Sequence, residues 1–258
     1  MFLVMPFYQG GDMFSMLLRR KRKQLTEKEA RFYVAQIHIA LMYLHKRNVI
    51  YRDLKLENVV LDIKGHIKLI DFGLAKIVSK GKRTFTICGT PEYMAPDVLA
   101  RKPSGYGTAV DWWGLGVCCY ELLTGLPAWY TSDRRKLFDR IRSAPLRLPP
   151  SAPPEAGACV AALLRRHPKQ RLCAMNGADE LRGEAFFASV DFDALVLGAL
   201  EPPIKPCRSL SRPAHRANFD GRFTTLPVDT PVEGPDPAFL DGDDALATGW
   251  EFVRPEPV

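Results

Sequence analysis

Several features that would assign this 258-residue chain to a particular protein class are absent from its sequence. None of its six cysteines forms a C-x-x-C pair, so neither a zinc site nor a redox pair of that type is indicated. No apolar run approaches the ~18 residues of a membrane span, and the N-terminus lacks the basic-then-apolar design of a secretory signal. We therefore expect a cytoplasmic protein, with a nuclear location left open, and no membrane partner.

The 36 lysine and arginine residues outnumber the 29 aspartate and glutamate residues, so the formal net charge is +7. Part of this excess is one run, RRKRK at 19–23, which fits either a solvated loop edge or a nuclear-import or phosphate-binding patch. No aromatic residue interleaves with the run, so a surface for base stacking is not supported. No nucleic-acid partner is expected.

The composition changes near residue 190. Ten of the 21 prolines fall within 202–258, and from residue 229 onward eight acidic residues face a single basic one. We expect a folded body at 1–188 and an extended tail at 189–258, for which disorder is the alternative. Aromatic residues could anchor this tail on a surface: Phe219, Phe223, Trp250 and Phe252.

The body reads as mostly helical, with few strands. Thr26 and Glu29 form a capping box, and apolar residues then recur at spacings of three and four, which predicts a helix from about residue 27 to 46–48. The stretch at 110–125 is apolar almost all round and ends in glycine, which predicts a buried helix. Two strands, at 59–61 and 67–70, are expected to form a hairpin.

Four polar residues at the ends of these strands suggest a chemistry. Asn58 and Asp71 offer the oxygen atoms that Mg²⁺ prefers, and Lys55 offers a positive charge for a phosphoryl group. Asp53 could accept a hydrogen bond from an attacking hydroxyl. Each residue alone could be an ordinary turn residue, but together they match what phosphoryl transfer requires.

The motifs that contain these residues resemble those of the protein kinase family. YRDLKLEN at 51–58 is similar to the catalytic loop, DFG follows at 71–73, and GTPEYMAPD at 89–97 resembles the end of an activation segment. Tyr51 in place of histidine resembles the AGC branch of serine/threonine kinases. So do TICGTPEY, VDWWGLG, HPKQRL and the segment at 217–231, which is closest to the ribosomal protein S-six kinases.

The resemblance implies a fold class and a set of cofactors. The fold would be mainly α (α+β): the large lobe of a kinase with a remnant small-lobe strand at 2–5, a hinge, and an AGC-type C-terminal tail. Asp53 would orient the substrate hydroxyl and Lys55 would contact the transferred phosphate of ATP, while Asn58 and Asp71 would bind Mg²⁺. The nucleotide would also meet residues of the hinge and the hairpin: Met5, Pro6, Tyr8, Asp12, Val60 and Ile70.

The same resemblance implies sites for protein partners. An upstream kinase would phosphorylate Thr86 in the activation loop, where Arg52 and Lys76 would pair with the phosphate; Thr230 would be a second phosphosite. Substrates would carry basic residues before the phosphoacceptor and would contact five side chains: Asp12, Glu57, Glu121, Ile87 and Met94. The three carboxylates among them could equally be ordinary surface groups.

Two substitutions in the motifs are expected to have structural effects. Asp97 would pair with Arg171, and because aspartate is one methylene shorter than the glutamate usual there, a longer contact is expected. Leu56 replaces a proline of the family pattern, which should make the loop less rigid.

The resemblance also implies parts that this sequence does not contain. A search for G-x-G-x-x-G fails, since GYGTAV at 105–110 and GLGVCC at 114–119 lack the third glycine, and no VAIK-like segment exists. We therefore expect a fragment or shortened form of a kinase polypeptide, inactive or nearly so by itself. The alternatives are a non-catalytic docking module and a basic nucleic-acid-binding protein, for which no recognition motif exists.

Overall fold

The computed structural model describes residues 6–79, 81–100, 103–150, 152–207 and 218–219. The strand predicted at 2–5, with Met5, and the tail features at Thr230 and 249–253 lie outside the described residues.

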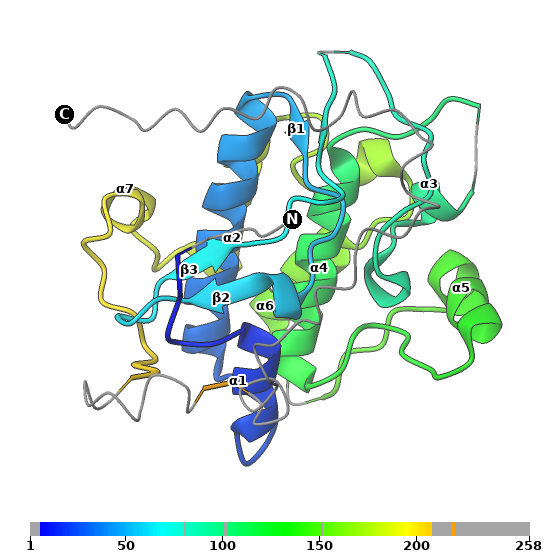
Figure 1. The fold of residues 1–258 in the computed structure, drawn as a ribbon. Helices are drawn as coiled ribbons and strands as arrows, with labels where there is room; N and C mark the ends of the chain where they lie inside the picture. The colour runs from blue at the N-terminus through cyan, green and yellow to red at the C-terminus, as the bar shows by residue number, and fades with distance from the viewer. Residues whose placement is uncertain (1–5, 80, 101–102, 151, 208–217, 220–258) are drawn as a thin grey trace, which may run out of the picture. The chain divides into compact units, whose positions relative to one another are not determined.

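Three helices form the centre of the molecule: α2 (Glu27–Lys46), α4 (Ala109–Thr124) and α6 (Pro154–Leu163). α4 contacts α2 on one side and α6 on the other, and Figure 1 shows α2 and α4 running side by side. The other helices are α1 (Met13–Arg19), α3 (Pro96–Leu99), α5 (Arg134–Ser143) and α7 (Phe192–Val196), and the strands are β1 (Val49–Ile50), β2 (Val59–Leu61), β3 (Ile67–Leu69) and β4 (Lys76–Ile77). The predicted helix-rich fold with little strand is confirmed.

The start of α2 is fixed by the predicted capping box. The Glu29 amide donates to the Thr26 hydroxyl at 3.3 Å, and the Thr26 amide donates to the Glu29 carboxylate at 2.8 Å. These two bonds satisfy backbone donors that the first helical turn leaves without partners. α2 then places one apolar face in the core, ending at Lys46 within the predicted limits.

α4 is buried on nearly all sides, as its apolar sequence predicted. Trp113, Leu115 and Cys118 are fully buried. Gly125 ends the helix in the left-handed region, with φ of 90°, where glycine carries no steric penalty.

The predicted hairpin is present as antiparallel β2 and β3, with Val59 opposite Leu69 and Leu61 opposite Ile67. The segment before α1 pairs with the outer edge of β2, because Gly10 donates to the Leu61 carbonyl and Leu61 donates to the Gly11 carbonyl, each at 2.9 Å. A side chain at Gly10 would lie 2.5 Å from the Leu61 carbonyl oxygen, so this approach requires glycine. β1 pairs with β4 in a second two-stranded ribbon.

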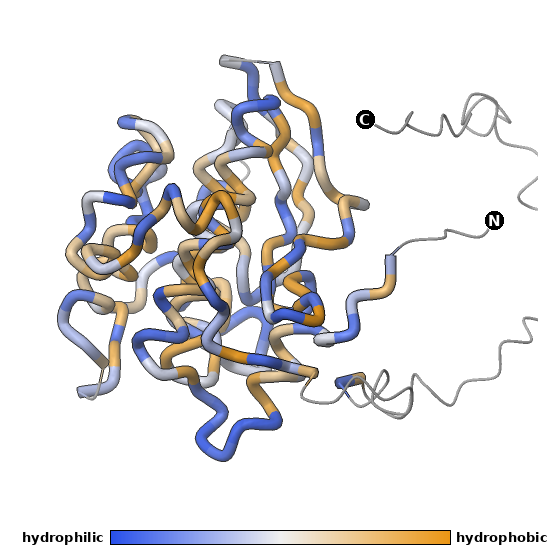
Figure 2. The backbone as a smooth tube through the Cα atoms, turned by 90° about the vertical axis from the view of Figure 1, so that its left-hand side faces the viewer, coloured by the Kyte–Doolittle hydropathy of each residue, from blue (hydrophilic) through white to orange (hydrophobic). Residues whose placement is uncertain are grey.

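Packing continues beyond residue 188, where the sequence was expected to leave the folded body. Phe192 and Leu195 of α7 are 7% and 4% exposed and belong to the same core as α2 and α4. The described residues between 6 and 219 belong to one compact unit. Figure 2, in which the tube is coloured by the hydropathy of each residue, shows hydrophobic segments running through the part of the chain that the structure describes. Within the described residues, no helix is both long and apolar enough to cross a membrane.

Candidate active site

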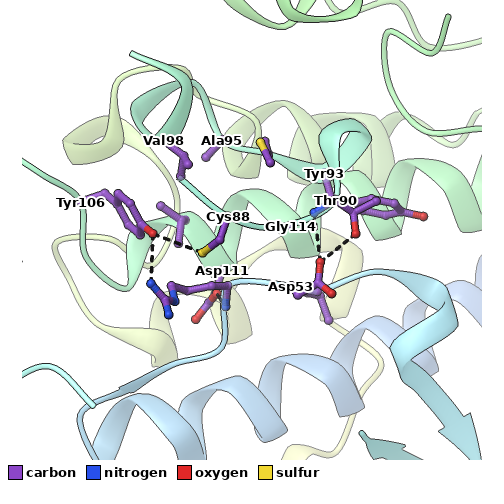
Figure 3. Close-up of a pocket in the computed structure, with 14 residues that line it drawn as sticks. Asp53, Cys88, Thr90, Tyr93, Ala95, Val98, Tyr106, Asp111 and Gly114 are labelled. Atoms are coloured by element: carbon purple, nitrogen blue, oxygen red, sulfur yellow. Dashed lines mark hydrogen bonds between the residues drawn. The ribbon is translucent and has the colours of Figure 1, made fainter. Parts of the chain in front are cut away.

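Asp53 lies at the centre of a hydrogen-bonded network between α2 and the hairpin. One carboxylate oxygen accepts the Thr90 amide at 3.0 Å and the Thr90 hydroxyl at 2.7 Å, as the close-up in Figure 3 shows. The other oxygen lies 3.1 Å from the Lys55 ammonium and accepts the Asn58 side-chain amide, also at 3.1 Å. Lys55 in turn donates to the Thr90 hydroxyl at 3.1 Å. Asp53 is only 7% exposed, so these bonds hold it in one orientation.

The backbone of this loop is held by Asp111 at the start of α4. Its carboxylate accepts the Tyr51 amide at 2.9 Å, the Arg52 amide at 2.8 Å and the His45 ring Nε2–H at 2.7 Å. Arg52 has φ of 68°, a backbone conformation that is unfavourable for a residue with a side chain. The buried Asp111 carboxylate binds the amide of this strained residue and that of the residue before it.

Asn58 and Asp71 are brought together by the end of β3. The Ile70 amide donates to the Asn58 carbonyl at 3.0 Å, and the Ile70 carbonyl accepts the Tyr51 hydroxyl. Burial first, and then the Asp53 and Asp71 carboxylates, raise the pKa of Tyr51. One phenol therefore feels the negative charge of both aspartates. Asp71 follows Ile70 directly, so the Ile70–Asn58 bond brings the backbone of the two hairpin ends together, and the convergence of the Asp53 and Asp71 carboxylates stays a prediction.

The hinge-like segment approaches β2 from the other side. Asp12 forms a bridge with Val60, and its carboxylate caps α1 by accepting the Ser15 amide at 2.7 Å. Val60 is 7% exposed, whereas Pro6 is exposed and Tyr8 half-buried. Asp12 and Val60, both predicted to lie at the nucleotide site, are thus adjacent. Phe219 stacks on Phe7 with ring centroids 5.2 Å apart, and so the aromatic anchor predicted for this part of the chain does contact the body.

The segment around Thr86 is connected to Arg52 through Tyr106. The Tyr106 hydroxyl donates to the Thr86 carbonyl at 2.5 Å and accepts from the Arg52 guanidinium at 3.4 Å. The Thr86 side chain is exposed, and Lys76 donates to the nearby Thr84 hydroxyl at 3.2 Å. Arg52 and Lys76 therefore lie beside this segment without contacting the Thr86 hydroxyl among the described interactions.

The predicted substrate-binding carboxylates do not all lie on the open surface. Glu57 is exposed and Asp12 partly so, but Glu121 is 1% exposed and accepts the Tyr93 hydroxyl. Burial raises the pKa of Glu121 to about 7. Glu121 is therefore not the ordinary surface carboxylate that was the alternative for it, and its contact with substrate stays a prediction.

The two apolar side chains predicted to contact the substrate also differ in solvent exposure, because Ile87 is 39% exposed and Met94 only 7%. Further along the chain, the Arg171 guanidinium donates to Asp97 at 2.7 Å, and its side chain is fully buried. The expectation of a longer contact is wrong, because the backbone brings the shorter aspartate within normal hydrogen-bonding distance.

The comparisons with known proteins decide the family. Residues 1–182 match the protein kinase domain family. The chain belongs to this family. Its relatives are AGC-type serine/threonine kinases: serine/threonine protein kinase ypkA of Aspergillus fumigatus is 42% identical over 259 residues, covering 99% of this chain and 39% of that protein. The RAC-beta serine/threonine-protein kinase of Homo sapiens is 45% identical over 227 residues, covering 87% and 46%.

The ribosomal protein S6 kinase beta of Caenorhabditis elegans is 40% identical over 258 residues, covering 99% of this chain and 45% of the relative. Because kinases of several AGC subfamilies match at similar identity, the predicted AGC branch is confirmed without favouring the S-six kinases. The chain spans less than half the length of these three curated relatives.

Protein kinases use ATP with Mg²⁺, and the donors present here fit that cation. The Asn58 side-chain nitrogen is bonded to Asp53, which leaves its amide oxygen for a metal. The exposed Asp71 carboxylate accepts only the Gly73 amide, at 3.1 Å, among the described hydrogen bonds. Two oxygen ligands suit Mg²⁺, which takes its remaining ligands from water and phosphate.

Sequence reasoning missed the residues that hold the catalytic loop and the activation segment in place by hydrogen bonds. Asp111, His45 and Tyr106 shape the catalytic loop and the activation segment, yet none was singled out. A signal existed for Asp111, because a carboxylate within a mostly apolar helix, as at Asp111 and Glu121 of α4, must find buried hydrogen-bond donors. No comparable local signal marks His45 or Tyr106.

Proposed function

We propose that this chain supplies the catalytic-loop half of a kinase that transfers the γ-phosphoryl group of ATP to serine or threonine of a protein. The observation that carries the proposal is the buried Asp53 carboxylate, held by Thr90 and Lys55 and bonded to the side-chain amide of Asn58, one of the two candidate magnesium ligands. Such a site positions reactants and stabilises charge, which is most of what phosphoryl transfer requires.

Each side chain would have a distinct role in this reaction. Asp53 would accept the hydrogen bond of the attacking hydroxyl and so orient its oxygen. Lys55, 22% exposed at its side chain, would neutralise charge on the transferred phosphoryl group. Asn58 and Asp71 would hold Mg²⁺, which when bound offsets the charge of the phosphate oxygens.

We propose substrates with basic residues before the phosphoacceptor, which Asp12 and Glu57 would bind. Both carboxylates have exposed surface, and Ile87 offers an exposed apolar side chain for the residue after the phosphoacceptor. Phosphorylation of Thr86 by an upstream kinase would add about two negative charges beside Arg52 and Lys76, which would fix the activation segment.

A polypeptide of these 258 residues alone is expected to be a poor catalyst, because its sequence contains no Gly-rich loop or strand lysine to hold the nucleotide phosphates. Misplacement of reactants alone costs on the order of a hundredfold in rate. The alternative for such a chain is a docking module without turnover.

Labelled phosphate transfer from ATP to an arginine-rich serine peptide tests the proposal. Slow transfer is expected from the 258-residue chain, reduced at least tenfold by Asp53→Asn and by Asp71→Ala. Asp139→Asn, which alters an exposed ion pair on α5, serves as the control and should leave transfer unchanged. Equal background in all four proteins would favour the docking module.

A further inference from the structure

A second surface feature is unconnected with the catalytic loop. The connection between α4 and α5 and the segment after α5 enclose a groove of about 720 Å³. Its lining is mainly apolar, and two large side chains in it are unusually open: Leu126 is 56% exposed and Tyr130 46% exposed. Adjacent exposed apolar side chains of this size commonly mark a binding surface.

The charged side chains that line this groove are both arginines, Arg140 and Arg147. Both are exposed, and neither forms an ion pair with any residue that the structure describes. Arg140 donates to the Tyr130 carbonyl at 2.9 Å, so its guanidinium is held at the groove rather than extended into solvent. No carboxylate is among the lining side chains.

The basic run at 19–23 lies at the same groove. The Gln24 side chain, which lines the groove, donates to the Thr124 carbonyl at 3.0 Å, and the Leu25 amide donates to the Leu122 carbonyl at 2.8 Å. A side chain at Gly125 would lie 2.7 Å from the Lys23 carbonyl oxygen. The exposed residues 21–23 therefore lie next to Gln24 at one end of the groove. They belong to the hydrophilic loop at the lower edge in both views (Figure 1, Figure 2).

We propose that this surface, the basic-rimmed groove, binds an acidic segment of a partner protein that carries an apolar anchor residue. The apolar lining would bury the anchor, and the arginines with the 21–23 run would complement the acidic residues on either side. A recessed groove suits an inserted side chain better than a flat lipid surface. The basic run has no interleaved aromatic residues on which nucleic-acid bases could stack.

Selection from a random dodecapeptide library displayed on phage tests this proposal with the full 258-residue chain as bait. Enrichment of peptides that combine several Asp or Glu residues with Phe, Trp or Leu is expected. The strongest synthetic peptide is then measured by fluorescence anisotropy. The absence of such enrichment would overturn the proposal.

Two pairs of variants locate the binding. Arg140→Glu with Arg147→Glu should weaken the peptide at least tenfold, whereas Arg134→Glu with Arg135→Glu changes the same net charge on exposed α5 residues outside the groove and should change affinity less than twofold. Leu126→Ser should also weaken binding at least tenfold. Leu197→Ser, at a residue 82% exposed and outside the groove lining, should not.

Three results would contradict an acidic protein segment as the ligand. Loss of affinity in both charge-reversed pairs alike would indicate non-specific attraction. Tighter binding of phosphatidylserine–phosphatidylcholine vesicles or of a DNA duplex than of the selected peptide would indicate another anion. Self-association of the chain, abolished by Leu126→Ser in sedimentation, would indicate a second copy in the groove.

Discussion

One carboxylate, that of Asp111, maintains the shape of the catalytic loop. It accepts three hydrogen bonds and is 2% exposed, so water cannot substitute for any of them. Asp53 projects from the loop that these bonds hold. The geometry of the proposed active site therefore depends on a residue that would not touch the substrate.

Asp111→Asn tests this dependence. The amide keeps one acceptor oxygen but points N–H₂ at a backbone donor, which leaves that donor buried without a partner at a cost of about 1–3 kcal/mol. Urea unfolding should show this loss of stability. Asp139→Asn, at an exposed ion pair, should change the unfolding free energy by less than about 0.5 kcal/mol. Equal stability of Asp111→Asn and the parent chain would contradict the account.

His38 is a second residue whose role is set by burial. Its Nε2 lies 2.7 Å from the Ala178 carbonyl, which can only accept, so Nε2 carries the proton and Nδ1 does not. Nδ1 is buried without a partner among the described residues. Burial beside Trp112 and Phe192 lowers the pKa of His38 to about 4.

Stability should therefore fall on acidification. The unfolded chain binds a proton at His38 below its ordinary pKa of 6.5, while the folded chain does not until about 4. The free energy of unfolding is therefore highest above pH 6.5, where His38 is neutral in both states. It should fall by about 2 kcal/mol between pH 7 and pH 5. Urea unfolding at several pH values should give a flatter profile for His38→Phe than for the parent.

His167→Asn, at an exposed site, is the control and should keep the parent profile. The raised pKa of Glu121 acts in the opposite direction, because that group gains a proton in the folded state first, but it contributes equally to every variant. Identical profiles for His38→Phe and the parent would show that His38 is not the titrating group.

At the scale of elements, the contact between α4 and α6 determines how the helical body packs. Gly116 of α4 faces Leu163 and Leu164, and a side chain there would lie 2.8 Å and 2.9 Å from their atoms. The absence of a side chain lets the two helices approach closely.

Gly116→Ala should destabilise the protein through this contact. Overpacking costs about 1–3 kcal/mol, which exceeds the gain of ~1 kcal/mol from replacing glycine inside a helix. Thermal unfolding measures the difference. Gly183→Ala, where a side chain would meet no atom within 4 Å, should be near neutral. A stabilised Gly116→Ala would mean that propensity outweighs packing here.

At the scale of the whole molecule, local patterns were sufficient to predict α2, α4 and the hairpin. The capping box at Thr26 and the periodic apolar face predicted α2, and two short strands of branched residues predicted the hairpin. The assignment of Asp53, Asn58 and Asp71 rests on two short motifs, YRDLKLEN and DFG, that can be recognised locally in the sequence, and their roles stay predictions.

The remaining features depend on contacts between distant segments. Asp111 bonds to residues 59 and 60 positions earlier, and Tyr106 bonds to Thr86. The Tyr93 hydroxyl donates to the buried Glu121 carboxylate from 28 positions earlier, a pairing that local patterns do not identify. The continued packing of α7 likewise depends on where the core surface lies, which composition alone does not indicate.

Binding of ATP by the 258-residue chain, followed by calorimetry with and without Mg²⁺, tests the central claim most directly. The claim is that Asn58 and Asp71 hold Mg²⁺ beside Asp53. The account predicts that Mg²⁺ strengthens ATP binding and that Asp71→Ala weakens it at least tenfold, while Asp139→Ala does not. Equal, Mg²⁺-independent binding by the parent chain and Asp71→Ala would contradict it.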